Sequence, residues 1–397
     1  MKEKDTIIFS ETYRYLANPV YFSIVPKLNE YRKIYLNPND PAVQWEKNEI
    51  DKNEILKFFD VYVELEKIDI HISGFRKTFK VYYRYKRIIY NYLDKIKPKA
   101  IISCSDMSLS DRILSSWCKK KKIPFIIIQP SFIDSSFLHK KSITEMIRYY
   151  VVNKLLKLHK YRKQHLFGNE AQWTYLLLWS KYFIENPYRK NMFFIGNPVF
   201  DKLFNEFSPQ RTRNNNIIIC TQEIDLLFGE KVNQKVMDIY KKAIKSKPDI
   251  IFYIKLHPRE SIEKYALIFK KHEYPNVRIV KNQDLYDLFR KCDLQISVFS
   301  FTSFEAAAMG LPIILINPNN SIKILDHFRG EININISDVT EICEAIDIAL
   351  SEEYWEKFLK KREKYFQKMV LSLDGKSSER ASNQIKNLIT RKKSRRN

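Results

Sequence analysis

Short apolar runs alternate with longer amphipathic stretches along most of the chain. Such runs are typical of strands in a parallel sheet that is covered on both faces, and the amphipathic stretches are predicted to be the covering helices. Residues 13–50 give no clear pattern, and 54–67 fit a helix or a strand equally well. The predicted strands are 6–10, 100–105, 123–129, 174–180, 191–198, 216–221, 250–256, 277–280, 294–298, 313–316 and 332–336. The predicted helices are 75–96, 108–122, 231–246, 260–271, 284–291, 303–310, 338–350 and 352–370. This order predicts an α/β protein built from β-α-β units.

The length favours two such domains, because 397 residues exceed what one hydrophobic core usually organises. The polar segment SPQRTRNNN has the composition of a linker. We therefore predict an N-terminal domain over 1–206, a linker over 207–215, a second domain over 216–351, and C-terminal helices with a basic tail over 352–397.

One predicted strand of the second domain, IIFYIKL (250–256), ends at a basic polar cluster. Ligands of parallel sheets bind at the carboxyl ends of the strands, which is where His257 and Arg259 fall. A histidine beside basic residues can neutralise the charge of a phosphate, although a single histidine can also simply support its loop. We predict that Lys255, His257, Pro258 and Arg259 form one side of an anion site.

A second cluster follows the strand LQISV (294–298), where Ser300, Thr302 and Ser303 precede or open the predicted helix 303–310. The first backbone N–H groups of a helix have no intrahelical partners, and with the helix dipole they favour a phosphate. The three hydroxyls can bond a phosphate oxygen or only cap the helix. Glu305, expected in the first turn, can accept a hydrogen bond from a ribose hydroxyl or merely complement the dipole.

Three segments resemble known families. TSFEAAAMGLP, which precedes an apolar strand, resembles the nucleotide-sugar half of GT-B glycosyltransferases and is similar to the related UDP-GlcNAc 2-epimerases. KLHP (255–258) resembles the His-Pro motif of bacterial sialyl- and polysialyltransferases, capsule Kdo transferases and teichoic-acid polymerases. IGNPVFDKL resembles the segment that closes the first domain in epimerase-like and capsule-transferase chains. The resemblance is clearest over about 190–320 and weak before 95.

The resemblance implies a GT-B fold, with two Rossmann-like domains facing a cleft and a C-terminal helix that crosses back to the first domain. It implies that His257 helps to bind the donor phosphates and that the Ser/Thr cluster holds the nucleotide phosphate. The expected donor is a nucleotide sugar, with CMP-linked acidic sugars favoured by the His-Pro pairing and UDP- or CDP-linked donors still open. No cofactor beyond this substrate is implied.

The predicted reaction is inverting. Retaining GT-B enzymes carry two glutamates eight positions apart around this helix, and here the position eight before Glu305 is Ser297. Inversion needs a general base that deprotonates the acceptor hydroxyl. Asp106 is the best-placed acid of the first domain, although it could instead cap helix 108–122, and Asp111 is a weaker second. Other candidate bases are Glu11, Asp134 and His139.

The charge of the chain indicates an anionic partner. The net charge is +23, which suits a charged substrate, a membrane surface or nucleic acid, or only aids solubility. We predict no nucleic-acid binding, because no motif for it is present. No Asp-x-Asp or Cys/His cluster points to a metal, and five scattered cysteines favour a reducing compartment.

We expect a cytoplasmic enzyme that is peripheral at the inner face of the cell membrane, since no apolar run is long enough to span a bilayer. The basic segments 75–96 and 140–165 could lie on that surface, or pack against their own domain. The predicted function is glycosyl transfer from a nucleotide sugar to a glycan or lipid-linked glycan acceptor of a bacterial surface polysaccharide, such as capsule or lipopolysaccharide. The alternatives are a non-hydrolysing sugar-nucleotide 2-epimerase, a CDP-alditol phosphotransferase, and a nucleic-acid-binding protein without catalysis.

Overall fold

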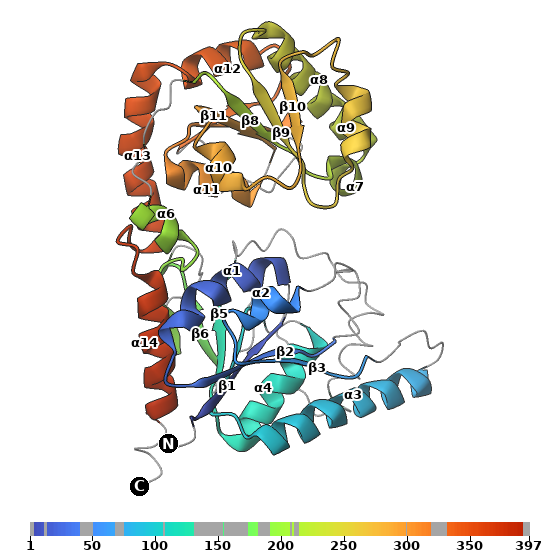
Figure 1. The fold of residues 1–397 in the computed structure, drawn as a ribbon, viewed down its shortest axis with the longest axis vertical. Coiled ribbons are helices and arrows are strands. Elements are labelled where there is room, and N and C mark those ends of the chain that lie inside the picture. The colour runs from blue at the N-terminus through green and yellow to red at the C-terminus, as the bar shows by residue number, and fades with distance from the viewer. Residues whose placement is uncertain are drawn as a thin grey trace. The chain divides into compact units, whose positions relative to one another are not determined.

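In the computed structural model the chain forms two compact units. Unit 1 comprises Met1–Asp201 and Met369–Asn397, and unit 2 comprises Lys202–Lys368 (Figure 1). The structure describes residues 4–11, 14–39, 51–67, 75–105, 108–130, 154, 174–181, 191–206, 209, 214–298, 300–318 and 332–391. The basic segment 140–165 therefore lies outside the described residues, apart from Lys154.

Unit 1 is built on a parallel sheet whose strand order, within the described residues, is β3-β2-β1-β4-β5-β6-β7. The register pairs Ile8 of β1 with Ile34 on one side and Ile101 on the other. The strands are β1 (Thr6–Ser10), β2 (Arg32–Asn37), β3 (Val61–Glu64), β4 (Ala100–Ser103), β5 (Phe125–Ile128), β6 (Thr174–Leu178) and β7 (Met192–Phe194). β2 and β3 fall in the stretches whose sequence pattern was unclear.

Helices cover both faces of this sheet. Alternate residues of a strand point to opposite faces, and here the side chains on both faces are apolar and need to be buried. Ile7 and Phe9 join a core with α1, α2 and α14, whereas Ile8 joins a separate core with α3 and α4. The helices are α1 (Arg14–Ile24), the short 3-10 helix η1 (Val25–Lys27), α2 (Lys52–Leu56), α3 (Phe75–Ile96), α4 (Leu109–Lys121) and α14 (Ser377–Thr390). The long basic helix predicted at 75–96 is confirmed as α3.

Unit 2 repeats the architecture with a parallel sheet of order β10-β9-β8-β11-β12-β13. The helices α8 and α12 cover one face through a core that contains Ile217, Ile219 and Tyr240. The strands are β8 (Ile217–Cys220), β9 (Phe252–Lys255), β10 (Val277–Val280), β11 (Leu294–Ser297), β12 (Ile313–Ile316) and β13 (Ile334–Ile336). The helices are α7 (Ile224–Phe228), α8 (Glu230–Ser246), α9 (Ile262–Ile268), α10 (Leu285–Phe289), α11 (Phe301–Met309), α12 (Ile342–Ala349) and α13 (Glu352–Val370). α6 (Phe200–Glu206) carries the chain out of unit 1.

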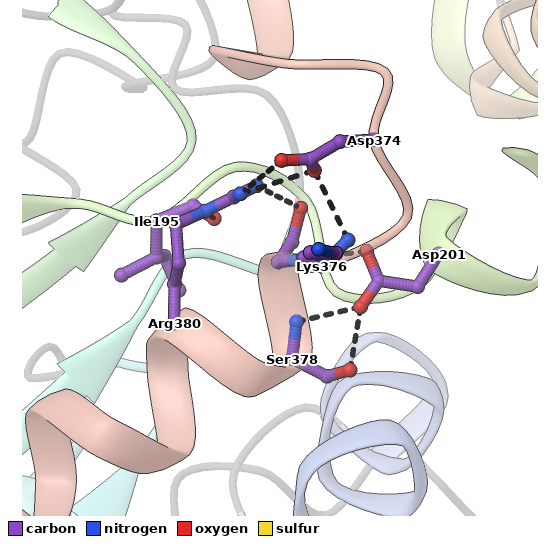
Figure 2. A network of polar contacts seen from close by, with 7 residues as sticks. Ile195, Asp201, Asp374, Lys376, Ser378 and Arg380 are labelled. Atoms are coloured by element: carbon purple, nitrogen blue, oxygen red, sulfur yellow. Dashed lines mark hydrogen bonds and ion pairs between the residues drawn. The ribbon is translucent and has the colours of Figure 1, made fainter.

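The C-terminal helix α14 belongs to unit 1, as the predicted return of the chain requires. Asp201 caps it: its carboxylate accepts from the backbone N–H of Ser377 at 2.8 Å and of Ser378 at 2.6 Å (Figure 2). Arg380 donates to the Ile195 carbonyl at 2.8 Å and pairs with Asp374 at 2.7 Å. A carboxylate at the first N–H groups of a helix is stabilising, so this network anchors α14 where the chain leaves unit 1.

No helix among the described residues is long and apolar enough to cross a membrane.

Candidate functional site

The polar residues predicted to bind an anion lie at the carboxyl edge of the unit 2 sheet. Thr221 follows β8, His257 follows β9 and Ser300 precedes α11, just after β11. The strand order reverses direction between β8 and β11, and ligands of open parallel sheets bind beside such a reversal. The loops after β9 and β11 flank β8, so two strand spacings, or about 10 Å, separate them.

A buried carboxylate closes the turn that carries His257. The His257 N–H donates to Glu260 Oε2 at 3.0 Å, and the Glu260 N–H donates to the His257 carbonyl at 2.9 Å. Glu260 Oε2 also accepts from the Thr221 hydroxyl, and Oε1 accepts from the Tyr265 hydroxyl at 2.7 Å. Glu260 therefore ties the turn after β9 to the end of β8.

The half-buried imidazole of His257 is held in one tautomer. The Arg259 N–H donates to His257 Nδ1 at 3.3 Å, so Nδ1 is an acceptor and the proton of the neutral ring lies on Nε2. Burial lowers the pKa of His257, and the positive charge of Arg259 lowers it further. His257 is thus a neutral ring whose Nε2–H can donate to an anion.

The two basic neighbours of His257 are used differently. The Lys255 ammonium donates to the carbonyl of Gln283 at 2.8 Å and to the carbonyl of Lys281, and burial lowers its pKa. Arg259 is exposed and pairs with Glu223 at 2.8 Å. Only the Arg259 side of this pair is exposed, since the Glu223 side chain is 15% exposed, and the Arg259 guanidinium can reach an anionic ligand from there, whereas Lys255 joins β9 to the loop after β10. Pro258 is exposed in the same turn.

Ser300 is the N-cap of α11. Its hydroxyl accepts from the Thr302 N–H at 3.2 Å and from the Thr302 hydroxyl at 2.8 Å. The Thr302 hydroxyl in turn accepts from the Gln295 amide at 3.0 Å. The capping role is therefore confirmed for Ser300, and phosphate binding by Ser300 and Thr302 stays a prediction.

The prediction that this helix starts at residue 303 is wrong, since α11 spans Phe301–Met309. Three hydroxyl residues compete for the cap, and the rings of Phe301 and Phe304, 5.9 Å apart and one turn apart, favour the earlier start. Ser303 therefore lies inside the helix, fully buried, with its hydroxyl 2.6 Å from that of Ser297. Its role in donor binding stays a prediction, but the hydroxyl is already engaged in the core.

Glu305 is placed in the second turn of α11 rather than the first. It accepts a hydrogen bond from the Tyr286 hydroxyl at 2.7 Å. Burial raises the pKa of Glu305 to about 7, which the Tyr286 bond only partly offsets. A carboxyl group that is half-protonated at neutral pH beside the reversal of a sheet is a candidate functional group, which agrees with the predicted ribose contact without testing it.

Two candidate bases of unit 1, Glu11 and Asp111, lie near the carboxyl ends of β1 and β4, where that sheet also reverses. Asp106 lies outside the described residues, so its role stays a prediction; the same holds for Asp134 and His139. Ser108 is the N-cap of α4, and the capping alternative for Asp106 lies outside the described residues.

Asp111 is a structural anchor of the loop that carries Asp106. It is fully buried in α4 and accepts from the hydroxyls of Ser103 at 2.8 Å and Ser108 at 2.7 Å. These bonds join the end of β4 to the start of α4. Glu11 is buried directly after β1, beside the same edge.

The described residues contain no group of three or more His, Cys, Asp or Glu side chains that could hold a metal ion.

Sequence reasoning missed three residues of the unit 2 edge: Thr221, Glu260 and Tyr286. Glu260 carries a weak signal, because an acid three positions after His257 can reach back to its backbone N–H as in a capping box. Tyr286 carries none, since its partner Glu305 lies 19 positions further along the chain.

Comparison with protein-family models gives no match, and neither does comparison with curated protein sequences. Solved structures do match over nearly the whole chain. UDP-GlcNAc 2-epimerase from Neisseria meningitidis, bound to UDP-GlcNAc, has a TM-score of 0.61 at 14% identity and covers 97% of this chain and 100% of its own. UGT2 of Phytolacca americana, in complex with UDP-2-fluoro-glucose and pterostilbene, has a TM-score of 0.60 at 10% identity, with coverage of 98% and 100%.

The glycotransferase of kitacinnamycin has a TM-score of 0.59 at 11% identity and covers 98% of this chain and 100% of its own. At such identities the likeness establishes the architecture, namely two parallel-sheet, Rossmann-like units with flanking helices. The predicted fold class is therefore confirmed, and the chain has the GT-B fold.

Proposed function

We propose that the protein is a nucleotide-sugar-dependent glycosyltransferase. The observation that carries the proposal is the carboxyl edge of unit 2, where the neutral imidazole of His257 and the high-pKa carboxyl of Glu305 flank β8 beside the reversal of the sheet. The first suits the phosphates of a nucleotide and the second its ribose. The GT-B fold and neighbours solved with UDP or UDP-GlcNAc support the same substrate class.

In the proposed reaction the acceptor hydroxyl attacks the anomeric carbon of the donor sugar as the bond from that carbon to the phosphate oxygen breaks. Asp106 takes the proton from the attacking hydroxyl. The nucleotide leaves with the bonding electrons, and His257 Nε2–H donates to a phosphate oxygen that gains charge. These groups need no metal ion, and we propose a metal-independent reaction.

We propose inversion at the anomeric carbon. The position eight before Glu305, where retaining GT-B enzymes carry the other of their two glutamates, is Ser297, which is buried and bonded to Ser303. A buried hydroxyl cannot assist a retaining reaction as a carboxylate would. The His-Pro pairing favours CMP-linked acidic sugars as donors, with UDP- and CDP-linked sugars next.

A thermal-shift panel of CMP, CDP, UDP and their sugar conjugates tests the proposal. A ligand at about 100 times its Kd stabilises the folded protein by about 2.7 kcal/mol. We expect one nucleotide series to raise Tm in the wild type and to lose most of this shift in the His257→Ala variant. No shift with any nucleotide would refute the proposed substrate class.

The second candidate is a non-hydrolysing sugar-nucleotide 2-epimerase, which the likeness to UDP-GlcNAc 2-epimerases favours. The two functions differ in their need for an acceptor. An epimerase converts the sugar nucleotide alone, whereas a transferase releases the nucleotide at a useful rate only when a glycan acceptor is present. Proton exchange at the sugar C2, followed by NMR in deuterated water without acceptor, would favour the epimerase.

We further propose that the acceptor is a bacterial surface glycan, or a lipid-linked precursor of one, and that the enzyme works at the inner face of the membrane. The net charge of +23 supports attraction to anionic lipids, at about 1 kcal/mol for each Lys or Arg near the surface. Flotation with anionic and with neutral vesicles tests this. Salt-sensitive flotation with anionic vesicles alone is expected, and equal behaviour with both would remove the membrane from the proposal.

A further inference from the structure

Glu260 is a buried acid at the centre of the His257 turn, and neither the predicted site nor the proposed reaction uses it. The residue is 7% exposed. The donors that the described residues give its carboxylate are neutral, namely a backbone N–H and two hydroxyls. A carboxylate is costly to bury unless hydrogen bonds replace its water, so an acid kept here calls for a reason.

We infer that Glu260 is a positioning residue, which holds the turn so that the His257 ring keeps its Nδ1 as acceptor and its Nε2–H as donor for the donor phosphates. The part of this inference that concerns phosphates rests on the proposed function.

The first argument is the geometry of the turn. The Glu260 backbone N–H donates to the His257 carbonyl at 2.9 Å, and the Glu260 side chain accepts from the His257 N–H at 3.0 Å. The two bonds close a ring around the residues between them. Inside that ring the Arg259 N–H meets His257 Nδ1 at 3.3 Å, so the tautomer of the imidazole depends on the closed turn.

The second argument is how Glu260 connects the turn to the neighbouring strands. Its carboxylate accepts from Thr221, directly after β8. Its backbone carbonyl accepts from Lys281, directly after β10, at 2.7 Å. The end of β9 is thereby tied to the strands on both sides of it, which fixes where the imidazole lies relative to the reversal of the sheet.

The third argument concerns the need for a carboxylate. Oε2 accepts from both the His257 N–H and the Thr221 hydroxyl, while Oε1 accepts from the Tyr265 hydroxyl. Both oxygens of a carboxylate are acceptors, whereas an amide offers one acceptor and one donor. Glutamine has the same size, but its one acceptor oxygen can serve only one side of the network, and a hydroxyl on the other side must turn round to accept from its NH₂ group, so it weakens the network without leaving a cavity.

The test compares Glu260→Gln with the wild type in two measurements. The ¹⁵N shifts of the His257 ring report its tautomer in the free protein, with the signals assigned by their loss in the His257→Gln variant. Calorimetric titration with CMP, CDP and UDP reports the affinity for the nucleotide. We expect the Glu260→Gln variant to lose the single Nε2–H tautomer. We expect its Kd for the nucleotide that binds wild type to rise about tenfold, the effect of making one charged hydrogen-bond acceptor neutral.

Glu263→Gln is the matched control, because Glu263 is an exposed acid of the next helix whose carboxylate accepts from Ser261 at 2.6 Å. It removes the same charge nearby and should change neither measurement. Tyr265→Phe is the second variant, since it removes a bond to Oε1 and leaves Oε2 with His257. It should lower stability while preserving the tautomer, which separates packing from positioning.

The outcomes distinguish this inference from the proposed function. If Glu260→Gln leaves the His257 tautomer and the nucleotide Kd at wild-type values, the positioning role is overturned while the function stands. If wild type binds none of the three nucleotides, the proposed function fails. The tautomer measurement then decides alone, and an unchanged tautomer would overturn the positioning role as well.

Discussion

The raised pKa of Glu305 predicts how the stability of unit 2 depends on pH. Burial raises the pKa from its ordinary 4.5 to about 7. A carboxyl group whose pKa is raised by folding contributes stability that is fully present below the unfolded pKa and is lost as pH rises toward the folded pKa. Glu305 therefore destabilises unit 2 increasingly between pH 4.5 and about pH 7. Glu305→Gln cannot ionise, and its amide oxygen can still accept the bond from Tyr286.

The size of the effect follows from the shift. The pKa of Glu305 rises from 4.5 to about 7, a shift of about 2.5 units. Each unit of pKa shift changes the free energy of unfolding by about 1.36 kcal/mol, so the whole shift corresponds to about 3.4 kcal/mol. The Glu305 side chain is partly exposed, and solvent screening reduces this figure. We expect the free energy of unfolding of Glu305→Gln, relative to wild type, to rise by about 2 kcal/mol between pH 5 and pH 8.

The assay is urea unfolding of both proteins at pH 5 and pH 8, followed by pulsed hydrogen exchange of peptides from β11 and β12, which reports unit 2 separately from unit 1. Glu344→Gln is the control, because Glu344 is an exposed acid of α12 in the same unit. If the free energies of unfolding of Glu305→Gln and wild type differ by the same amount at pH 5 and at pH 8, the reasoning is refuted, whatever the size of that difference.

Three further predictions concern the site and the frame around it. His257→Ala should lower kcat/KM for the donor with the fold intact by circular dichroism, since it removes the Nε2–H donor; wild-type kcat/KM would contradict the phosphate role. Asp106→Asn should lower kcat by about 10²–10⁴ with donor binding unchanged, the usual contribution of a general base, and near-normal turnover in a steady-state assay would transfer that role to another acid. Gly196→Ala should destabilise unit 1. Gly196 has φ +83°, and an added Cβ would lie 2.8 Å from the Val370 carbonyl oxygen and 2.3 Å from the Ser377 hydroxyl. The expected loss is about 2–4 kcal/mol of unfolding free energy by chemical denaturation, and a loss below about 1 kcal/mol would show that the backbone yields there.

Most of the fold could be predicted because buried parallel strands leave a strong local signal. IIIC of β8 and IILI of β12 are apolar throughout and were recognised from that pattern alone. β2 was missed because RKIYLN mixes charged and polar residues with apolar ones, although all but Arg32 are buried. α1 was missed because it contains Pro19, which normally argues against a helix. In both cases packing in the core of unit 1 overrides the local preference.

The site was less predictable, since its geometry depends on partners distant in sequence. His257 was recognised from its position after a strand, but Thr221, which shares Glu260 with it, lies 36 residues earlier. Ser303 was also recognised from the sequence, but its surroundings in the fold could not be predicted. Its residue type suits phosphate binding, yet the hydroxyl of Ser297 on the neighbouring strand already engages it. Residue type and spacing identify which edge carries the chemistry, while tertiary contacts decide which hydroxyls are available there.

The capping of α14 by Asp201 has a consequence for synthesis of the chain. α14 supplies Ala381 and Ile385 to the core that covers one face of the unit 1 sheet, so that face stays incomplete until α14 has been made. Unit 2 is continuous over Lys202–Lys368 and is translated in the interval. At a rate of synthesis of about 5–20 residues per second this interval lasts about 10–30 s. During this interval the first unit still exposes the apolar surface that α14 covers, while the second unit is made and can fold, so the loss of α14 would destabilise the N-terminal unit.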